Sequence, residues 1–164
     1  MAGLCLVTKR IIKYVDGDET LLDQIRPLWE ALNRHHLALS MIFKQYYLDM
    51  TFQKRKTDLI KKAALGEMRV DIAVDDVSGQ NIGYCISSLT EEKIGEVQSI
   101  YVSEPYRSLG IGDALMKKAL GWLDEKGAVE KFVEVGAGNE QTLGFYSRYD
   151  FLPRKTMLKQ VQKV

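Results

Sequence analysis

The sequence lacks long apolar runs. Its apolar stretches fall far short of the roughly 18 consecutive residues that indicate a membrane-spanning helix. The chain starts with Met-Ala-Gly-Leu-Cys-Leu-Val-Thr-Lys-Arg, which has no basic segment ahead of a long apolar one, as an export signal would. We therefore expect a cytoplasmic protein that makes no contact with a membrane.

Cysteine and histidine are scarce, with two of each. Cys5 and Cys85 lie in apolar, strand-like surroundings, which indicates free buried thiols rather than a disulfide. His35 and His36 are adjacent, whereas a metal-binding pair on one helix prefers a spacing of four residues. We therefore predict no metal site and a reducing compartment.

The charge is balanced, with 23 Lys and Arg against 22 Asp and Glu and a net charge of +1. A basic run at residues 54–62 is interrupted by Asp58 and flanked by Asp49 and Glu67, which favours a solvated helix face. We expect no nucleic-acid partner. The 164 residues suit a single domain.

The apolar pattern predicts an edge strand at 4–15, then a helix that starts at Thr20 or later because Pro27 fits only its first turn. One or two helices should occupy 40–66, with the aromatic residues there in the core. A three-stranded meander follows, at 69–74, 82–89 and 93–102. A helix at 112–126, a strand at 129–135, a helix at 139–149 and a last strand at 154–161 complete the prediction. The crossover makes the strands at Val102 and Val133 parallel neighbours.

The stretch from Ile100 to Leu115 breaks a strand at a proline and restarts as an amphipathic helix. Gly110 and Gly112 remove two Cβ atoms from the turn, so backbone N–H groups can close around an anion at the positive end of the helix. This pattern predicts a binding loop for phosphate or pyrophosphate. The alternative is an ordinary tight turn with Arg107 as a surface charge.

Spacing separates the known anion loops. The sequence Gly-x-x-x-x-Gly-Lys-Ser/Thr of a P-loop is absent from the chain. A dinucleotide-binding fingerprint needs a third small residue at position 115, which is Leu115. The sequence therefore disfavours both a P-loop and a dinucleotide-binding loop.

The segment Arg107-Ser108-Leu109-Gly110-Ile111-Gly112, preceded by Val102 and Pro105, resembles the Arg/Gln-x-x-Gly-x-Gly/Ala loop of the GNAT superfamily of acyl-CoA-dependent N-acyltransferases. The resemblance extends over about residues 70–155 and includes the stretch from Asn139 to Phe151. The family pattern has Gly where this chain has Asp150, a residue that can also adopt the left-handed conformation of a helix stop.

The resemblance implies an α/β (α+β) fold: a mixed, mostly antiparallel, twisted sheet of six to seven strands with helices on both faces. It also implies one N-acetyltransferase domain over 1–164, with the first strand and acceptor-side helices in 1–66 and the acyl-CoA-binding core in 67–164. GNAT members often form homodimers, so the last strand and the sheet edge beside it are a possible dimer contact.

The resemblance further implies a site for acetyl-CoA as co-substrate, without a metal. The implied coenzyme A-binding residues are Ile100, Tyr101, Val102, Arg107, Ser108, Leu109, Gly110, Ile111, Gly112, Asn139, Phe145 and Tyr146. Asn139 is either a tether for the pantetheine arm or a plain helix N-cap.

Tyr146 and Glu96 are the implied catalytic residues. Tyr146 matches the family tyrosine near the coenzyme A sulfur and would be the general acid, unless it is a core residue beside Phe145. Glu96 matches a strand glutamate that serves some members as general base, unless it is a solvent-facing charge. One of the two histidines could also line the acceptor pocket.

The expected reaction is direct transfer of the acetyl group from acetyl-CoA to a primary amine, whether of a small molecule or a peptide. Two other classes of function stay open: a non-catalytic acyl-CoA sensor and a nucleotide-binding regulator.

Overall fold

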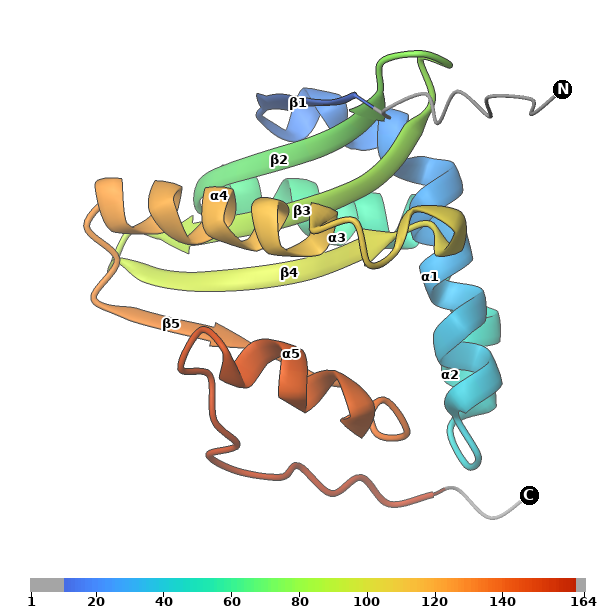
Figure 1. The fold of residues 1–164 in the computed structure, drawn as a ribbon. Helices are drawn as coiled ribbons and strands as arrows, with labels where there is room; N and C mark the ends of the chain where they lie inside the picture. The colour runs from blue at the N-terminus through green and yellow to red at the C-terminus, as the bar shows by residue number, and fades with distance from the viewer. Residues whose placement is uncertain (1–10, 162–164) are drawn as a thin grey trace, which may run out of the picture.

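The structure, a computed structural model, describes residues 11–161. A single twisted sheet holds β1 (Ile12–Gly17), β2 (Gly66–Asp75), β3 (Asn81–Thr90), β4 (Ile94–Val102) and β5 (Glu130–Val133), in that spatial order (Figure 1). The first four strands are antiparallel and β5 runs parallel to β4. The mixed α/β fold is therefore confirmed, and so is the parallel crossover between the strands that end at Val102 and Val133.

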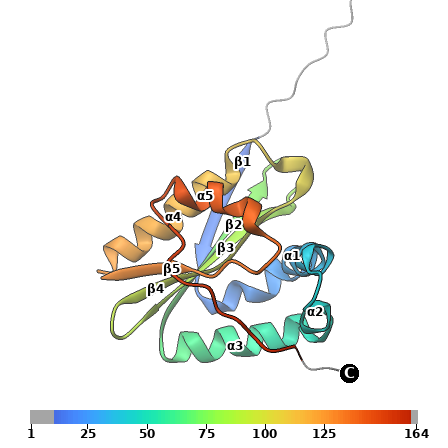
Figure 2. The same ribbon diagram turned by 90° about the horizontal axis from the view of Figure 1, so that it is seen from below.

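Helices cover both faces of the sheet, as predicted (Figure 2). One face carries η1 (Glu19–Ile25), α1 (Arg26–Leu39) and α3 (Phe52–Ala64), and α2 (Lys44–Asp49) packs beside α1. The other carries α4 (Ile111–Glu125) and α5 (Leu143–Ser147), with the short turns η2 (Glu104–Tyr106) and η3 (Glu140–Thr142) before them. Pro27 lies in the first turn of α1, where its missing N–H costs no helix hydrogen bond.

The number of strands differs from the expected six to seven, because the sheet of the described residues has five. Residues 151–161 form no strand, although one was predicted at 154–161. Met157 and Leu158 are 85% and 90% exposed, so this segment packs against nothing that would hold it in a ladder. The N-terminal part of the predicted first strand, and Cys5 with it, lies outside the described residues.

Two apolar clusters form the core, one on each face of the sheet. On the face that carries η1 and α3, the cluster includes Leu22, Ile25 and Leu59. On the other face, Leu115 and Ala119 of α4 belong to one cluster with Val97 of β4. Leu115 is fully buried, so its replacement by Ala would cost about 2 to 5 kcal/mol of stability. Cys85 is a free buried thiol, as expected.

The aromatic segment before α3 is less buried than predicted. Phe52 joins the core, but Ile42 and Tyr46 are 67% and 55% exposed. The reason is positional: α2 lies beyond the edge of the sheet, beside the lower end of α1 (Figure 1). Its side chains therefore have no sheet face to cover.

The strands β4 and β5 form a fork. Only Ile94–Val97 pair with Glu130–Val133, and β4 then continues to Val102 beside β3 alone. A β-bulge lies at the branching point, where Gln98 is the extra residue of β4 opposite Ile86 and Ser87. Bulges bend a strand and increase its twist, so this one favours the separation of β4 from β5.

Candidate active site

The loop between β4 and α4 contains two residues with positive φ. Ser108 has a φ of 65° and Gly110 a φ of 76°, and Gly110 is the N-cap of α4. No side chain caps this 15-residue helix, and the N–H groups of its first turn have no partner within the helix. Free N–H groups at the positive end of a helix are suited to an anion.

The two glycines of the loop have different surroundings. A Cβ at Gly110 would have no atom within 4 Å, and a Cβ at Gly112 would contact only side chains, of which the ring of Phe145 is nearest at 3.6 Å. Packing of the protein against itself therefore does not require glycine at either position. The positive φ of Gly110 does require it, and a ligand that approaches the backbone closely would require both.

Side chains hold the loop against the sheet. Arg107 Nε donates to the carbonyl of Val102 at 3.1 Å, and its guanidinium carbon lies 5.6 Å from the ring centroid of Tyr101. Tyr106 Oη donates to Asp75 at 2.8 Å, and this hydrogen bond is the main cause that lowers the pKa of Asp75. These contacts attach the loop to β2 and β4.

The second half of β4 turns backbone groups into the fork. Ser103 N–H donates to the carbonyl of Ile82 at 2.8 Å, which makes this pair a hydrogen-bonded pair of the antiparallel ladder. Hydrogen-bonded and non-hydrogen-bonded pairs alternate, so Val102 and Ile100 point their N–H and C=O groups away from β3. The carbonyl of Val102 accepts a hydrogen bond from Arg107. The backbone N–H and C=O groups of Ile100 face the space between the separated parts of β4 and β5.

Glu96 belongs to a polar cluster on the α3 side of β4. Its Oε2 accepts hydrogen bonds from Lys62 Nζ at 2.7 Å and from Gln98 Nε2 at 2.5 Å. Gln98 Nε2 also donates to Ser88, and Gln98 Oε1 accepts from Arg55 at 3.2 Å. The Glu96 side chain is only 15% exposed, so it is a positioned carboxylate and not a freely solvated charge.

Tyr146 lies on the opposite side of the fork, on α5. It packs beside Phe145 against the cluster under α4, with the two ring centroids 5.3 Å apart. Burial raises the pKa of Tyr146 to about 12, and the neighbouring Cys85 adds to this shift. The phenol therefore keeps its proton at neutral pH and is available as a donor.

A profile described as the acetyltransferase (GNAT) family matches residues 29–151, which include the loop, both arms of the fork and α5. The chain belongs to the GNAT acetyltransferase family. This confirms the resemblance seen in the Arg107–Gly112 segment.

Relatives and solved structures agree with this membership. An uncharacterised N-acetyltransferase of Chlorobaculum tepidum is 34% identical over 87 residues, which cover 52% of this chain and 56% of the relative. An N-alpha-acetyltransferase of Sulfurisphaera tokodaii is 30% identical over 105 residues, covering 57% and 63%. The chain thus aligns with little more than half the length of these relatives.

Two solved structures share the GNAT fold with this chain. A GCN5-related N-acetyltransferase from Ralstonia eutropha superimposes with a TM-score of 0.72 at 18% identity, covering 92% of this chain and 99% of the other. An aminoglycoside N-acetyltransferase in complex with CoA gives a TM-score of 0.68 at 15% identity, covering 97% and 99%.

Asn139 stands at the predicted N-cap position, immediately before η3, but its side chain does not act as a cap. Its Oδ1 instead accepts a hydrogen bond from Gln141 at 3.2 Å. Asn139 is 8% exposed, and its backbone carbonyl accepts from Thr142 Oγ1 at 2.8 Å. Asn139 therefore has the expected N-cap position, but the turn is closed by its backbone carbonyl, which accepts from Thr142 N–H and Oγ1, and not by its side chain.

The turn between β5 and α5 contacts α1 and α2. A Cβ at Gly138 would lie 2.6 Å from the carbonyl oxygen of Leu39, and one at Gly136 would lie 2.8 Å from the Tyr47 hydroxyl. His36 stacks on Tyr47 with ring centroids 5.7 Å apart. Burial lowers the pKa of His36, and His35 adds to the shift, so the neutral imidazole is favoured. This contact closes one end of the fork.

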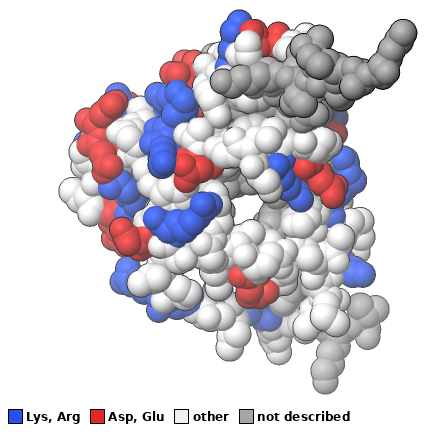
Figure 3. Space-filling view, viewed as in Figure 1, with Lys and Arg blue, Asp and Glu red and all other residues white. Residues whose placement is uncertain are grey.

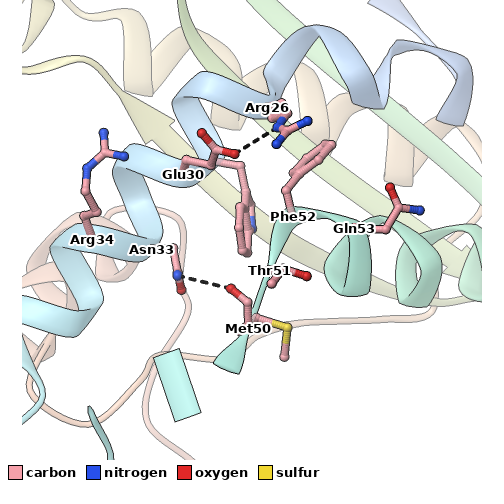
Figure 4. A pocket seen from close by; sticks show the side chains of 9 residues that line it. Arg26, Glu30, Asn33, Arg34, Met50, Thr51, Phe52 and Gln53 are labelled. Atoms are coloured by element: carbon pink, nitrogen blue, oxygen red, sulfur yellow. Dashed lines mark hydrogen bonds and ion pairs between the residues drawn. The ribbon is translucent and has the colours of Figure 1, made fainter. Parts of the chain in front are cut away.

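The space-filling surface has an opening in the region of Figure 1 that lies between β4 and α5 (Figure 3). Lys and Arg side chains lie on both sides of this opening. A separate cavity of about 380 Å³ lies between α1 and α3, with Trp29, Asn33 and Phe52 among its lining residues (Figure 4). None of the predicted site residues lines that cavity, so it is distinct from the fork.

The structure thus brings the loop residues, Ile100–Val102 and Phe145 to the open side of the fork, with Glu96 and Tyr146 on its two faces. Lys62, Arg55 and Gln98 were missed, because they come from separate elements and match no local motif. Within residues 11–161, no three His, Cys, Asp or Glu side chains lie close enough together to hold a metal ion. The same residues contain no helix long and apolar enough to cross a membrane.

Proposed function

We propose that this chain transfers the acetyl group of acetyl-CoA directly to a primary amine. The observation that carries the proposal is the combination of an uncapped helix N-terminus at Gly110 with the open edge of β4 beside it. The first suits a pyrophosphate and the second an amide-bearing arm. Pantetheine is such an arm, joined in coenzyme A to a pyrophosphate.

The candidate coenzyme A-binding residues would each bind a different part of the coenzyme A molecule along the fork. The N–H groups of residues 108–112 and the Arg107 guanidinium would hold the pyrophosphate. The backbone of Ile100–Val102 would bind the pantetheine amides, with Asn139 and Phe145 on the opposite side. Acetyl-CoA supplies an activated thioester whose carbonyl oxygen becomes negative during attack. The Ile100 N–H, which faces the fork, is a donor for that charge.

Glu96 and Tyr146 would move the protons. Most primary amines are protonated at pH 7 and cannot attack until a base removes one proton. Glu96 accepts that proton, directly or through a water molecule. The nitrogen then bonds to the acyl carbon, the carbon–sulfur bond breaks, and Tyr146 donates its proton to the departing thiolate. The second proton that the nitrogen loses as the amide forms returns to Tyr146 and restores the phenol. This mechanism requires both side chains to reach one reacting centre through the fork, Glu96 from the α3 side and Tyr146 from the α4 side.

A thiol-release assay with acetyl-CoA and a panel of amines tests the function. Aminoglycosides, amino acids, and peptides with free N-termini or lysines should be included, since the acceptor class is open. We expect at least one amine to accelerate thiol release, with the acetylated product seen by mass spectrometry. Tight coenzyme A binding with no transfer to any amine would instead identify an acyl-CoA sensor.

We also propose that two copies pair through the C-terminal segment. The strand β5 is at the edge of the sheet, and residues 154–161 expose Met157 and Leu158 without a partner strand among the described residues. An extended apolar segment and a free strand edge are complementary in hydrogen bonding. Sedimentation should show a dimer that becomes monomeric when the chain is truncated after Arg154. A full-length monomer at high concentration would exclude this contact.

A further inference from the structure

Arg148, the residue after α5, is an exposed cation held by two aromatic rings. Its guanidinium carbon lies 4.9 Å from the ring centroid of Phe145 and 5.7 Å from that of Tyr149. Cation–π contacts of this kind fix a guanidinium without using its N–H donors. Among residues 11–161, no carboxylate forms an ion pair with Arg148 and no group accepts a hydrogen bond from its side chain.

The same two rings contact the first turn of α4. Phe145 lies against Gly112, where its ring is 3.6 Å from the position of a Cβ. Tyr149 Oη donates to Asp113. Both rings therefore bridge Arg148 to the turn that is proposed to bind the pyrophosphate. The guanidinium stands at the rim of that site, on the residue that follows α5 and lies outside the loop motif.

Asp113 is the obvious partner for Arg148, but its carboxylate is already occupied. Oδ2 pairs with Lys117 at 2.8 Å and Oδ1 accepts from Tyr149. The hydrogen bonds from Lys117 and Tyr149 lower the pKa of Asp113, and the charge of Arg148 adds to this shift, but no Asp113 oxygen is bonded to the guanidinium. The N–H donors of Arg148 are therefore free of hydrogen bonds within the described residues. A preoriented guanidinium with free donors is suited to a phosphate, which it can bind through two parallel N–H bonds.

Coenzyme A carries its phosphate groups in two places: a pyrophosphate and a 3′-phosphate on the ribose. The backbone N–H groups of the loop and Arg107 already provide for the pyrophosphate, and they lie on the β4 side of the turn. We infer that Arg148 binds the 3′-phosphate of coenzyme A. This inference rests on the proposed function, since it requires coenzyme A to bind at the Gly110–Gly112 turn.

Calorimetry with coenzyme A and 3′-dephospho-coenzyme A tests the inference on the full chain. Arg148→Met keeps an apolar stem against the two rings and removes the charge. We expect the Kd for coenzyme A to rise by about tenfold, the low end for a lost charge-assisted hydrogen bond, while the Kd for the dephospho form stays the same. Arg148→Lys should recover part of the loss, because it restores the charge without the planar fork.

Arg154→Met is the matched control. Arg154 is an exposed arginine a few residues further on, paired with Glu130 at 3.1 Å, and its removal should change neither affinity. Equal losses for both ligands would place Arg148 on the pyrophosphate and overturn the 3′-phosphate assignment. Unchanged affinities in Arg148→Met would overturn it as well, with the proposed function intact if the wild-type chain binds coenzyme A. A wild-type chain that does not bind coenzyme A would overturn both.

Discussion

The two halves of β4 have similar apolar sequences but different neighbours. Ile94–Val97 are hydrogen-bonded on both edges, to β3 and to β5, whereas the half from Ile100 to Val102 pairs with β3 alone. Backbone N–H and C=O groups without a partner are costly when buried, so the open half needs water or a ligand along its free edge. The closed half holds the sheet together, and the open half is available to bind a substrate.

The side chains around the two halves of β4 differ as well: those near the closed half are hydrogen-bonded to one another, and those near the open half leave backbone groups accessible. Glu96, in the closed half, is held by Lys62 and Gln98 in a satisfied polar cluster. Beyond the open half, the loop presents Gly110, which has open space where a Cβ would lie, and Gly112, which lies beside the ring of Phe145. Rigid positioning of a carboxylate beside a surface left free for a ligand is the arrangement that catalysis by proximity needs.

The largest expected effect is on coenzyme A affinity, when side chains are added to the loop that follows the open half of β4. Gly110→Val and Gly112→Val would place branched side chains where the phosphate must approach the backbone. We expect the Kd for coenzyme A to rise by about 100-fold or more, because several charge-assisted hydrogen bonds are lost together. Calorimetry measures the affinity, and circular dichroism checks that each variant is folded.

Gly121→Val is the matched control for these glycine variants. Gly121 lies in the same helix, with no atom within 4 Å of a Cβ and without a positive φ, so coenzyme A affinity should be unchanged. If a folded Gly110→Val protein bound coenzyme A as tightly as the wild type, the loop would not be the binding site. The functional contrast between the two halves of β4 would then be lost.

A second variant distinguishes coenzyme A binding along the open half of β4 from the chemical step of acetyl transfer. Tyr146→Phe removes a proton donor but keeps the ring that packs beside Phe145. We expect kcat to fall by about tenfold or more, the low end of general-acid catalysis, with little change in coenzyme A affinity or melting temperature. Steady-state kinetics must use an acceptor for which the chemical step limits the rate.

Tyr46→Phe gives the control for this experiment, because Tyr46 is 55% exposed and lies on α2, away from α5. Its kcat should equal that of the wild type. Full activity of Tyr146→Phe under chemistry-limited conditions would show that Tyr146 only packs. The acid would then have to be sought elsewhere around the fork.

The smallest expected effect concerns the closed half. Glu96→Gln keeps the shape of the side chain and removes the base, so kcat/KM should fall by up to about tenfold. The loss should be greatest at low pH, where more of the acceptor amine is protonated and needs deprotonation. A pH profile of kcat/KM for both proteins measures this difference.

Glu91→Gln, in the exposed turn between β3 and β4, controls for the loss of one negative charge near the sheet. It should leave the profile unchanged. If Glu96→Gln followed the wild-type profile at every pH, the polar cluster would serve only to attach α3 to β4. The base would then be a different group or a water chain.

Most of the elements were predictable because their signals are local. Alternation located β2, β3 and β4, and the two loop glycines marked the start of α4. Asp150 does adopt the left-handed conformation expected of the residue that replaces the family glycine, with a φ of 63°. Each of these features depends on residues within a few positions of one another.

The failures concern contacts between distant segments. The predicted strand at 154–161 is absent because a strand needs a neighbouring strand to hydrogen-bond to. The local apolar sequence contains no information on whether such a neighbour lies close enough. The aromatic residues of α2 were expected in the core, yet Tyr46 is exposed because α2 lies outside the sheet. Propensity describes a segment, whereas burial depends on what lies opposite to it.

The sequence by itself determined the family, the anion-binding turn at Arg107–Gly112 and the order of strands and helices, since backbone conformation and periodicity are short-range properties. Only the tertiary structure decided where β4 separates from β5, that Lys62 meets Glu96 across 34 positions of the chain, and that Arg148 stands at the rim of a turn on another helix. Those arrangements arise from packing and charge pairing between elements, which act through space and leave no pattern along the chain.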